Sequence, residues 1–218
     1  MKTTTFLSPA SKALCAFRAP GLLAALLLAG CSVLPAPTAD PTRFYLLQGT
    51  AKPPEPATAA VGALRIGVHS IQLPPYLSNN RTMVVRSGVN EIRYEDYARW
   101  AEPLEAAVLH AVRERLLAAG GIATAETPPF SPDVRRDLDV TVRVLRCEGA
   151  SDPAKGNTAQ FEAVYEIADL RQNGQIVVRR DFKPAAAEWN GTDFAQLAAK
   201  LGDAAAALGN DIAVNLPR

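Results

Sequence analysis

The strongest constraint on the fold is a strict alternation of apolar and polar residues in the second half of the chain. Apolar residues occupy every second position first at Leu138, Val140, Val142 and Val144, and again at Phe161, Ala163, Tyr165 and Ile167. A period of two predicts β-strands that bury one face. The sequence Gln172-Asn173-Gly174-Gln175 then lies between the second of these segments and residues 176–182. Because Asn and Gly tolerate the positive φ of a type I′ turn, this order predicts a β-hairpin.

Shorter patterns predict further strands before this region. Residues 43–48 form an aromatic and aliphatic run, and residues 64–68 alternate before Pro74-Pro75. Residues 82–86 and 91–94 flank Ser87-Gly88-Val89-Asn90, whose glycine suits a tight connection. We expect a strand in each of the first two segments and a hairpin in the third.

Two segments have the period of amphipathic helices. In residues 102–119, Pro103 suits the first helical position, the apolar residues Leu104, Val108, Val112 and Leu116 recur every four residues, and Gly120-Gly121 follow. A second stripe begins after the capping residues 190–193 and comprises Phe194, Leu197, Leu201, Leu208 and Ile212. The sequence therefore predicts an α+β fold, with a largely antiparallel sheet and two amphipathic helices packed on one face.

The N-terminal thirty residues have the composition of an export signal. The first twenty carry cations and no acidic residue, and the apolar run from Gly21 to Ala29 is too short to span a bilayer. Leu28-Ala29-Gly30-Cys31 resembles the bacterial lipoprotein box. We predict a lipoprotein signal peptide over residues 1–30 and attachment of acyl chains such as palmitate to Cys31. The alternative is an ordinary secretion signal in which Cys31 is incidental.

Three prolines follow the predicted lipidation site within residues 31–42, which favours an extended tether. We expect a single periplasmic α+β domain over residues 43–218. Ser32 stands where an aspartate typically retains lipoproteins at the inner membrane, so we expect a lipid anchor in the outer membrane, with the domain on the periplasmic face. Cys15 leaves with the signal and Cys31 carries lipid, which leaves Cys147 without a disulfide partner.

The sequence favours binding over catalysis. A formal net charge of +1 across 218 residues does not indicate a nucleic-acid partner. Motifs for an activated nucleophile, a phosphate loop or a metal site are not found in the sequence, so we expect no enzyme activity, no cofactor and no metal. A hydrolase that uses His69 or His110 as its base remains the catalytic alternative.

Residues 71–103 combine aromatic residues, prolines and charges, a composition typical of protein interfaces. The candidate partner interface comprises Tyr76, Leu77, Arg81, Arg86, Trp100 and Glu102. For Trp100 the alternative is structural, because an apolar residue just before a helix can pack onto its first turn.

The same region carries a family resemblance. Its elements are Phe44-Tyr45-Leu46-Leu47, residues 66–74, Tyr76-Leu77, Arg81, Met83-Val84, Arg86, Asn90-Glu91-Ile92 and residues 99–104. Together they resemble the ABC-type transport auxiliary lipoprotein family. The likeness extends over nearly the whole chain after residue 31, although its specific motifs lie between residues 44 and 104.

The resemblance implies a non-catalytic outer-membrane lipoprotein that works with a mammalian-cell-entry (MCE) domain protein and an inner-membrane permease with its ATPase. Such a system moves lipids between the inner and outer membranes. The lipoprotein would dock the periplasmic conduit and support envelope integrity, and a homo-oligomer fits this role. The alternative function is an assembly or pilotin-like lipoprotein for an outer-membrane β-barrel or secretin complex.

Overall fold

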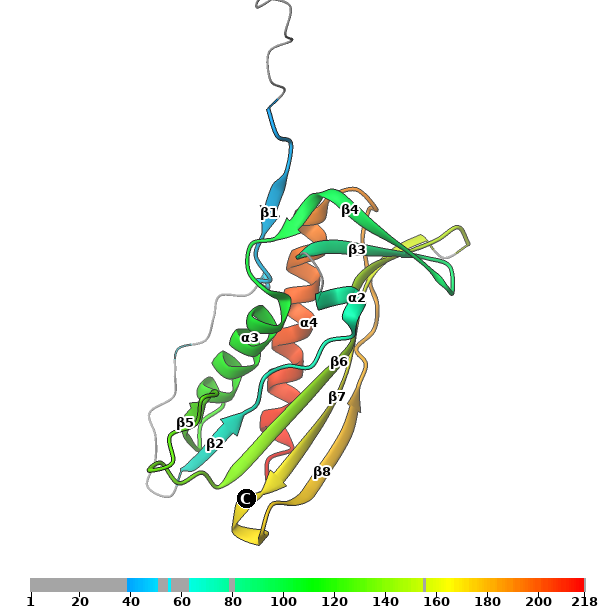
Figure 1. Ribbon diagram of the computed structural model, residues 1–218. Coiled ribbons are helices and arrows are strands. Elements are labelled where there is room, and N and C mark those ends of the chain that lie inside the picture. The colour runs from blue at the N-terminus through cyan, green and yellow to red at the C-terminus, as the bar shows by residue number, and fades with distance from the viewer. Residues whose placement is uncertain (1–38, 51–54, 56–62, 79–80, 155, 218) are drawn as a thin grey trace, which may run out of the picture. The chain divides into compact units, whose positions relative to one another are not determined.

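A ribbon of two long antiparallel strands forms the centre of the sheet (Figure 1). The computed structural model describes residues 39–50, 55, 63–78, 81–154 and 156–217. Strand β6 (Leu138–Asp152) pairs with β7 (Gly156–Asp169) along almost its whole length. Both strands extend beyond the alternating stretches that predict them. We refer to this pair as the β6–β7 ribbon.

The predicted signal peptide of residues 1–30 and most of the predicted tether lie outside the described residues. Residues Pro41–Arg218 form one compact unit. Among the described residues, no helix combines the length and the apolar character that crossing a membrane requires.

Two strands share the free edge of β6, one near each end. The beginning of β6 pairs in parallel with β2 (Leu64–Val68), and its end pairs in parallel with β3 (Thr82–Ser87). Beyond β2 lies β5 (Ile122–Glu126), again parallel. Beyond β3 the sheet continues through β4 (Glu91–Trp100), which is antiparallel, to β1 (Arg43–Tyr45), which is parallel to β4.

The outer edge of β7 is also shared by two strands. Strand β8 (Gln175–Phe182) pairs with its C-terminal half, and the short β9 (Ala187–Glu188) pairs near its beginning. The predicted α+β fold is confirmed, and the longest ladder, β6–β7, is antiparallel. Local patterns did not predict β5 or the parallel ladders, because parallel partners are distant in sequence and leave no turn signal between them.

Helices α3 (Leu104–Ala118) and α4 (Phe194–Val214) follow the two predicted apolar stripes. Asp193 caps α4, since its carboxylate accepts hydrogen bonds from the backbone N–H groups of Ala195 at 2.9 Å and Gln196 at 3.1 Å. Pro103 occupies the N-cap of α3, one position before the predicted place, with an extended ψ of 131°. A third helix, α2 (Pro75–Ser78), is a single turn that was not predicted.

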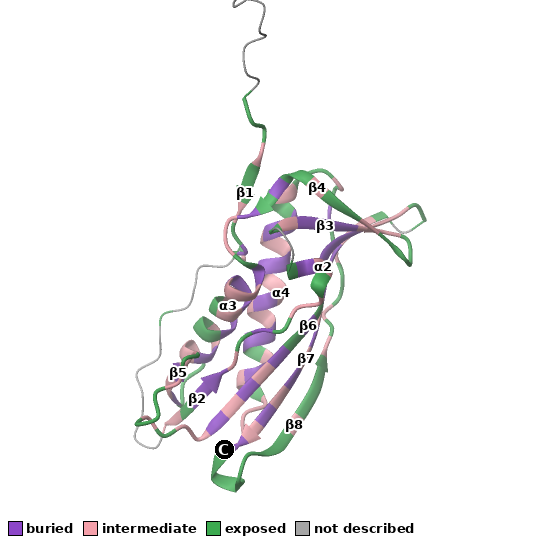
Figure 2. Cartoon of the chain, in the orientation of Figure 1, coloured by how far each residue is buried: buried purple, intermediate pink, exposed green. Residues whose placement is uncertain are grey.

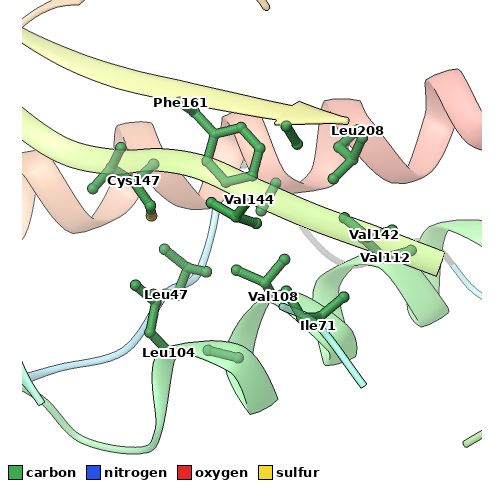
Figure 3. Packing of buried hydrophobic residues seen from close by; sticks show 14 of the residues in the cluster. Leu47, Ile71, Leu104, Val108, Val112, Val142, Val144, Cys147, Phe161 and Leu208 are labelled. Atoms are coloured by element: carbon green, nitrogen blue, oxygen red, sulfur yellow. The ribbon is translucent and has the colours of Figure 1, made fainter. Parts of the chain in front are cut away.

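The core lies between one face of the sheet and these two helices. Buried residues alternate with partly exposed ones along β6 and β7 (Figure 2). Val142 and Val144 of β6 face a cluster that includes Val108 and Val112 of α3 and Leu208 of α4 (Figure 3). The predicted placement of both helices on one face is therefore confirmed.

Two glycines of α4 allow unusually close contacts. A Cβ atom on Gly209 would lie 2.7 Å from Cβ of Arg115 and 3.1 Å from Cα of Val112, so α3 and α4 are in close contact here. A Cβ on Gly202 would lie 2.5 Å from the backbone nitrogen of Gly49. The segment after β1 crosses α4 at this point, and the Thr50 backbone N–H donates to Asp203 Oδ1 at 2.7 Å. Both glycines are required by packing rather than by backbone conformation.

The β7–β8 connection is longer than predicted. Asn173 and Gly174 have φ values of 56° and 75°, so the predicted positive φ at both residues is confirmed. A 3-10 turn over Leu170–Gln172 precedes them, and the ladder closes at Asp169 opposite Gln175. The prediction that Asn173 and Gly174 alone connect the two strands, as a two-residue type I′ turn, is therefore wrong. Asp169 causes the difference, because its carboxylate accepts hydrogen bonds from the backbone and side chain of Arg171 and stabilises the extra turn.

Candidate interface around the β3–β4 hairpin

The candidate interface begins with α2, which places Tyr76 against the outer face of the sheet. Pro75 opens this turn, where a missing N–H costs nothing. Tyr76 is half-buried, and its hydroxyl donates to the Leu145 carbonyl at 3.3 Å. Leu77 is only 3% exposed and belongs to the core, which removes it from the predicted interface. A one-turn helix presents neighbouring residues in different directions, so adjacent residues in the sequence differ in exposure here.

An ion pair between β3 and β6 lies beneath Tyr76. Arg86 Nε donates to Glu148 Oε1 at 2.6 Å, and the side chain of Glu148 is fully buried. Arg86 Nη2 lies 3.4 Å from the Tyr76 hydroxyl, and its guanidinium carbon is 5.7 Å from the centre of the Tyr76 ring. A buried carboxylate is costly without such a partner. Arg86 thus connects the hairpin, α2 and the β6–β7 ribbon.

Burial and the Glu148 carboxylate raise the pKa of Tyr76 to about 12. The hydroxyl therefore stays protonated at neutral pH and remains a donor to the Leu145 carbonyl. Burial also raises the pKa of the neighbouring Cys147 thiol well above its usual range. Since the thiolate is the reactive form, Cys147 acts here as an apolar core residue.

Trp100, at the end of β4, is only 3% exposed. The structural alternative for Trp100 is therefore correct, and its predicted place on a partner interface is wrong. Its backbone N–H donates to the Arg81 carbonyl at 2.6 Å, and Arg81 Nη1 donates to the Ala101 carbonyl at 3.2 Å. Arg81 itself remains exposed. An apolar side chain just before a helix reaches the core because the chain turns there onto the first helical turn.

Glu102 lies apart from the Arg86 cluster. It lines a groove of about 350 Å³ between the segment after β1, α3 and α4, together with His110, Glu114 and Gly202. His110 Nδ1 is 4.0 Å from Glu102 Oε2. The structure thus brings Tyr76 and Arg86 together, keeps Arg81 near the end of β4, and places Glu102 in a different groove.

Two further tyrosines on this surface were not among the predicted interface residues. Tyr94 is 44% exposed and lies on the same face as Arg86, because it is opposite Val84 while Ile92 is opposite Arg86. Tyr97 is 59% exposed on the irregular part of β4. Tyr94 already lay in the predicted strand 91–94, and Tyr97 would have been found if that strand had been extended to Trp100. No sequence pattern of this kind points to Glu148, because a buried charged residue interrupts the alternation of apolar and polar residues.

The two histidines occupy different surroundings. His69 Nε2 is 3.0 Å from Asp139 Oδ2, and Arg136 Nε donates to Asp139 Oδ1 at 2.9 Å. Burial raises the pKa of Asp139, but the hydrogen bonds from Arg136 and His69 outweigh it and lower the pKa overall. Phe130 completes the cluster, 4.0 Å below the Arg136 guanidinium. The group braces the outer face of the sheet, and in the described part of the chain no serine hydroxyl is hydrogen-bonded to either histidine.

Comparison with known proteins places this fold in a family. The family model for the ABC-type transport auxiliary lipoprotein component matches residues 45–213. The chain therefore belongs to this family, and the resemblance seen in its N-terminal half is confirmed over almost the whole domain. The family is a transport auxiliary component and a lipoprotein, which implies a membrane-associated protein of the cell envelope.

Two crystal structures share the fold. A Xanthomonas campestris protein assigned to the family model DUF330 is 19% identical, with a TM-score of 0.64, and the match covers 78% of this chain and 93% of that one. A structure described only as an uncharacterized protein is 15% identical, with a TM-score of 0.60, and the match covers 81% of this chain and 99% of that one. No curated protein matches the sequence significantly.

Proposed function

We propose that this protein is a non-catalytic outer-membrane lipoprotein subunit of an MCE-type ABC transport system that moves lipids between the inner and outer membranes. The observation that carries the proposal is the family match over residues 45–213, in a chain that also has Leu-Ala-Gly-Cys at residues 28–31. An auxiliary component with its own lipid anchor is suited to hold the end of a periplasmic conduit at a membrane. Its partners are an MCE-domain protein, a permease and an ATPase.

The proposed organisation has three parts. Residues 1–30 are the signal peptide, residues 31–42 are the lipidated Cys31 and tether, and residues 43–218 are the periplasmic domain. Several acyl chains on Cys31 give stable membrane attachment, whereas one chain gives only marginal attachment. Ser32 supports the outer membrane as the destination.

The docking surface we propose is the outer face of the β3–β4 hairpin. Tyr76, Arg86 and Tyr94 offer partly exposed aromatic and guanidinium groups there, the residue types that dominate binding energy at interfaces. The buried Glu148 fixes the Arg86 side chain through two hydrogen bonds of 2.6 and 3.4 Å. A fixed side chain loses little entropy when a partner binds.

Site-specific crosslinking in intact cells tests this proposal. A photoreactive residue at Tyr94 should capture an MCE-domain protein, identified by mass spectrometry after gentle membrane extraction. The matched control is the same residue at Ile176, which is 52% exposed on β8 at the opposite edge of the sheet. Capture of a secretin or a β-barrel at Tyr94 would instead support the assembly-factor alternative. Equal capture at both positions would remove the hairpin from the docking surface.

Membrane attachment is tested separately with Cys31→Ala. We expect the variant to accumulate as an uncut precursor or to leave the outer-membrane fraction. Unchanged fractionation with the outer membrane would contradict lipidation at Cys31.

A further inference from the structure

A small basic cleft opens where β1, β4 and β3 lie side by side. In the ladders, Phe44 of β1 is opposite Arg99 of β4, and Arg99 is opposite Thr82 of β3. Residues that are directly opposite in a ladder point to the same face of a sheet. The neighbours of Arg99 in β4, Ala98 and Trp100, are buried, so this row occupies the outer face. Phe44 is 64% exposed on it.

This row, which consists of Phe44, Arg99 and Thr82, lines a cleft of about 490 Å³ together with Arg81. Arg81 is held at its rim by its backbone, which has φ of 53° and accepts the Trp100 N–H. One of its guanidinium N–H groups donates to the Ala101 carbonyl at 3.2 Å. A guanidinium has five N–H donors, so most of those on Arg81 remain for a ligand.

The two arginines of this cleft form no ion pair within the described part of the chain. In the described residues, Arg86, Arg93, Arg136, Arg171 and Arg179 each form an ion pair with a carboxylate. No ion pair among these residues involves Arg81 or Arg99, although both are exposed. Two unpaired guanidinium groups at one cleft therefore create a local positive potential.

We propose that this cleft binds the phosphate group of a membrane lipid. Guanidinium groups recognise phosphate oxygens through paired hydrogen bonds. Phe44 and Leu46 are 64% and 50% exposed and lie two residues apart in the sequence, next to the cleft. They supply an apolar surface for the part of the lipid below its headgroup. A soluble phosphate compound would need the arginines but not these apolar side chains.

The position of the cleft in the sequence favours a membrane as the source of the ligand. Eleven residues separate Cys31 from Arg43, the first residue of β1. A fully extended chain spans at most about 3.6 Å per residue, so the cleft cannot lie more than about 40 Å from a lipid attached to Cys31. The inference rests on the anchored part of the proposed function and is independent of the MCE partner.

Vesicle co-flotation tests the inference with the complete chain from residue 31, carrying Cys31→Ser so that no acyl chain contributes. We expect binding to vesicles of phosphatidylcholine with 30% phosphatidylglycerol, and weaker binding to pure phosphatidylcholine. Because each arginine near an anionic surface contributes roughly fivefold to binding, Arg81→Gln with Arg99→Gln should weaken binding about 25-fold. Phe44→Ala should cause a smaller loss.

The matched control is Arg93→Gln with Arg179→Gln, which removes the same charge from arginines that are paired with Glu95 and Glu166. Equal losses in the two double variants would show attraction to net charge alone and overturn the cleft. Arg99→Gln alone, at an exposed strand position, keeps the test valid if a thermal melt shows that the double variant is unfolded.

A titration with inorganic phosphate separates the two sources of the ligand. Phosphate binding that depends on Arg81 and Arg99, together with no vesicle binding, would overturn the lipid assignment. Vesicle binding that Phe44→Ala weakens, while phosphate affinity stays unchanged, would support it. A failure of MCE crosslinking would not affect either result, so the two proposals fail separately.

Discussion

Where α4 covers the β6–β7 ribbon, the inward side chains Val140, Val142, Tyr165 and Ile167 are fully buried, and the opposite face carries charged side chains. At the other end, four consecutive residues from Cys147 to Ala150 are buried, so both faces of β6 are covered. Trp189 lies against Gly149 on the inner face, and Arg86 holds Glu148 on the outer face. We refer to these regions as the helix-covered end and the hairpin end.

The difference concerns the kind of force that fixes each end. Apolar burial provides most of the stabilisation at the helix-covered end, where contacts are not directional, and the hydrogen bond from the Tyr165 hydroxyl to Asp211 Oδ2 at 2.6 Å is the directional contact to α4. The hairpin end depends on an ion pair with defined distances. A position fixed by directional bonds suits a surface that must present side chains to a partner, which is the role we propose for the hairpin.

The largest effect should come from breaking the ion pair at the hairpin end. Arg86→Ala leaves the Glu148 carboxylate buried without a partner, so we expect a loss of about 3 to 5 kcal/mol in the free energy of unfolding, measured by urea denaturation. The double variant Arg86→Met with Glu148→Leu should recover most of that loss. If the double variant is as unstable as Arg86→Ala, the ion pair is not the reason for the effect.

A comparable but less specific loss is expected at the helix-covered end. Leu208→Ala removes a side chain with 0% exposure from the contact between α4 and the ribbon, which should cost about 2 to 5 kcal/mol. Crosslinking from Tyr94 to a partner should be retained by the folded fraction, because the hairpin end does not depend on this contact. A parallel loss of crosslinking in folded protein would contradict the separation of the two ends.

A smaller effect should follow from adding one methyl group between the helices. Gly209→Ala places a Cβ atom 2.7 Å from Cβ of Arg115, and overpacking of this kind costs about 1 to 3 kcal/mol. The control is Ala207→Gly, a change of the same size on a partly exposed face of α4. Ala is favoured over Gly inside a helix by about 1 kcal/mol, so a Gly209→Ala protein that is more stable than the wild type by that amount would show that α3 and α4 can separate at no cost.

The smallest effect depends on pH and concerns Tyr76. Tyr76→Phe removes the hydrogen bond to Leu145, worth about 1 kcal/mol at pH 7. The pKa of Tyr76 is raised to about 12 in the folded protein, above an unfolded value near 10, so its contribution is present below pH 10 and is lost as the pH rises towards 12. The difference between wild type and variant should therefore shrink over this range in urea unfolding.

The control for Tyr76→Phe is Tyr97→Phe, since Tyr97 is 59% exposed. The stability difference between this control and the wild type should remain small at pH 7. A difference between wild type and Tyr76→Phe that stays constant from pH 9 to 12 would contradict the role of Glu148 and burial at Tyr76.

The sequence predicted the helix-covered end much better than the hairpin end. At the helix-covered end, Val140, Val142 and Val144 repeat with the period of a strand, and the α4 stripe begins after the capping Asp193, so local patterns coincide with the final structure. At the hairpin end, Glu148, Gly149 and Ala150 break the alternation although all are buried in a strand. Their burial depends on Arg86 and Trp189, which are distant in sequence.

The candidate site was predicted in part for the same reason. Tyr76 and Arg86 were selected by residue type and do lie together, 3.4 Å apart at their nearest polar atoms. Trp100 and Leu77 were selected by the same criterion but are core residues. Exposure of an aromatic residue near a proline depends on where the chain turns in three dimensions, which neither composition nor spacing reports.

The crossing of the segment after β1 over α4 has a mechanical consequence. A pull on the chain from its N-terminal side acts along β1, whose three residues are hydrogen-bonded in parallel with β4, and therefore loads that ladder in shear. The Thr50 backbone and hydroxyl, both bonded to the Asp203 carboxylate, resist next, where Gly202 allows the close crossing. Force applied on the N-terminal side of β1 therefore divides between β4, a strand of the hairpin that we propose meets the partner, and one turn of α4.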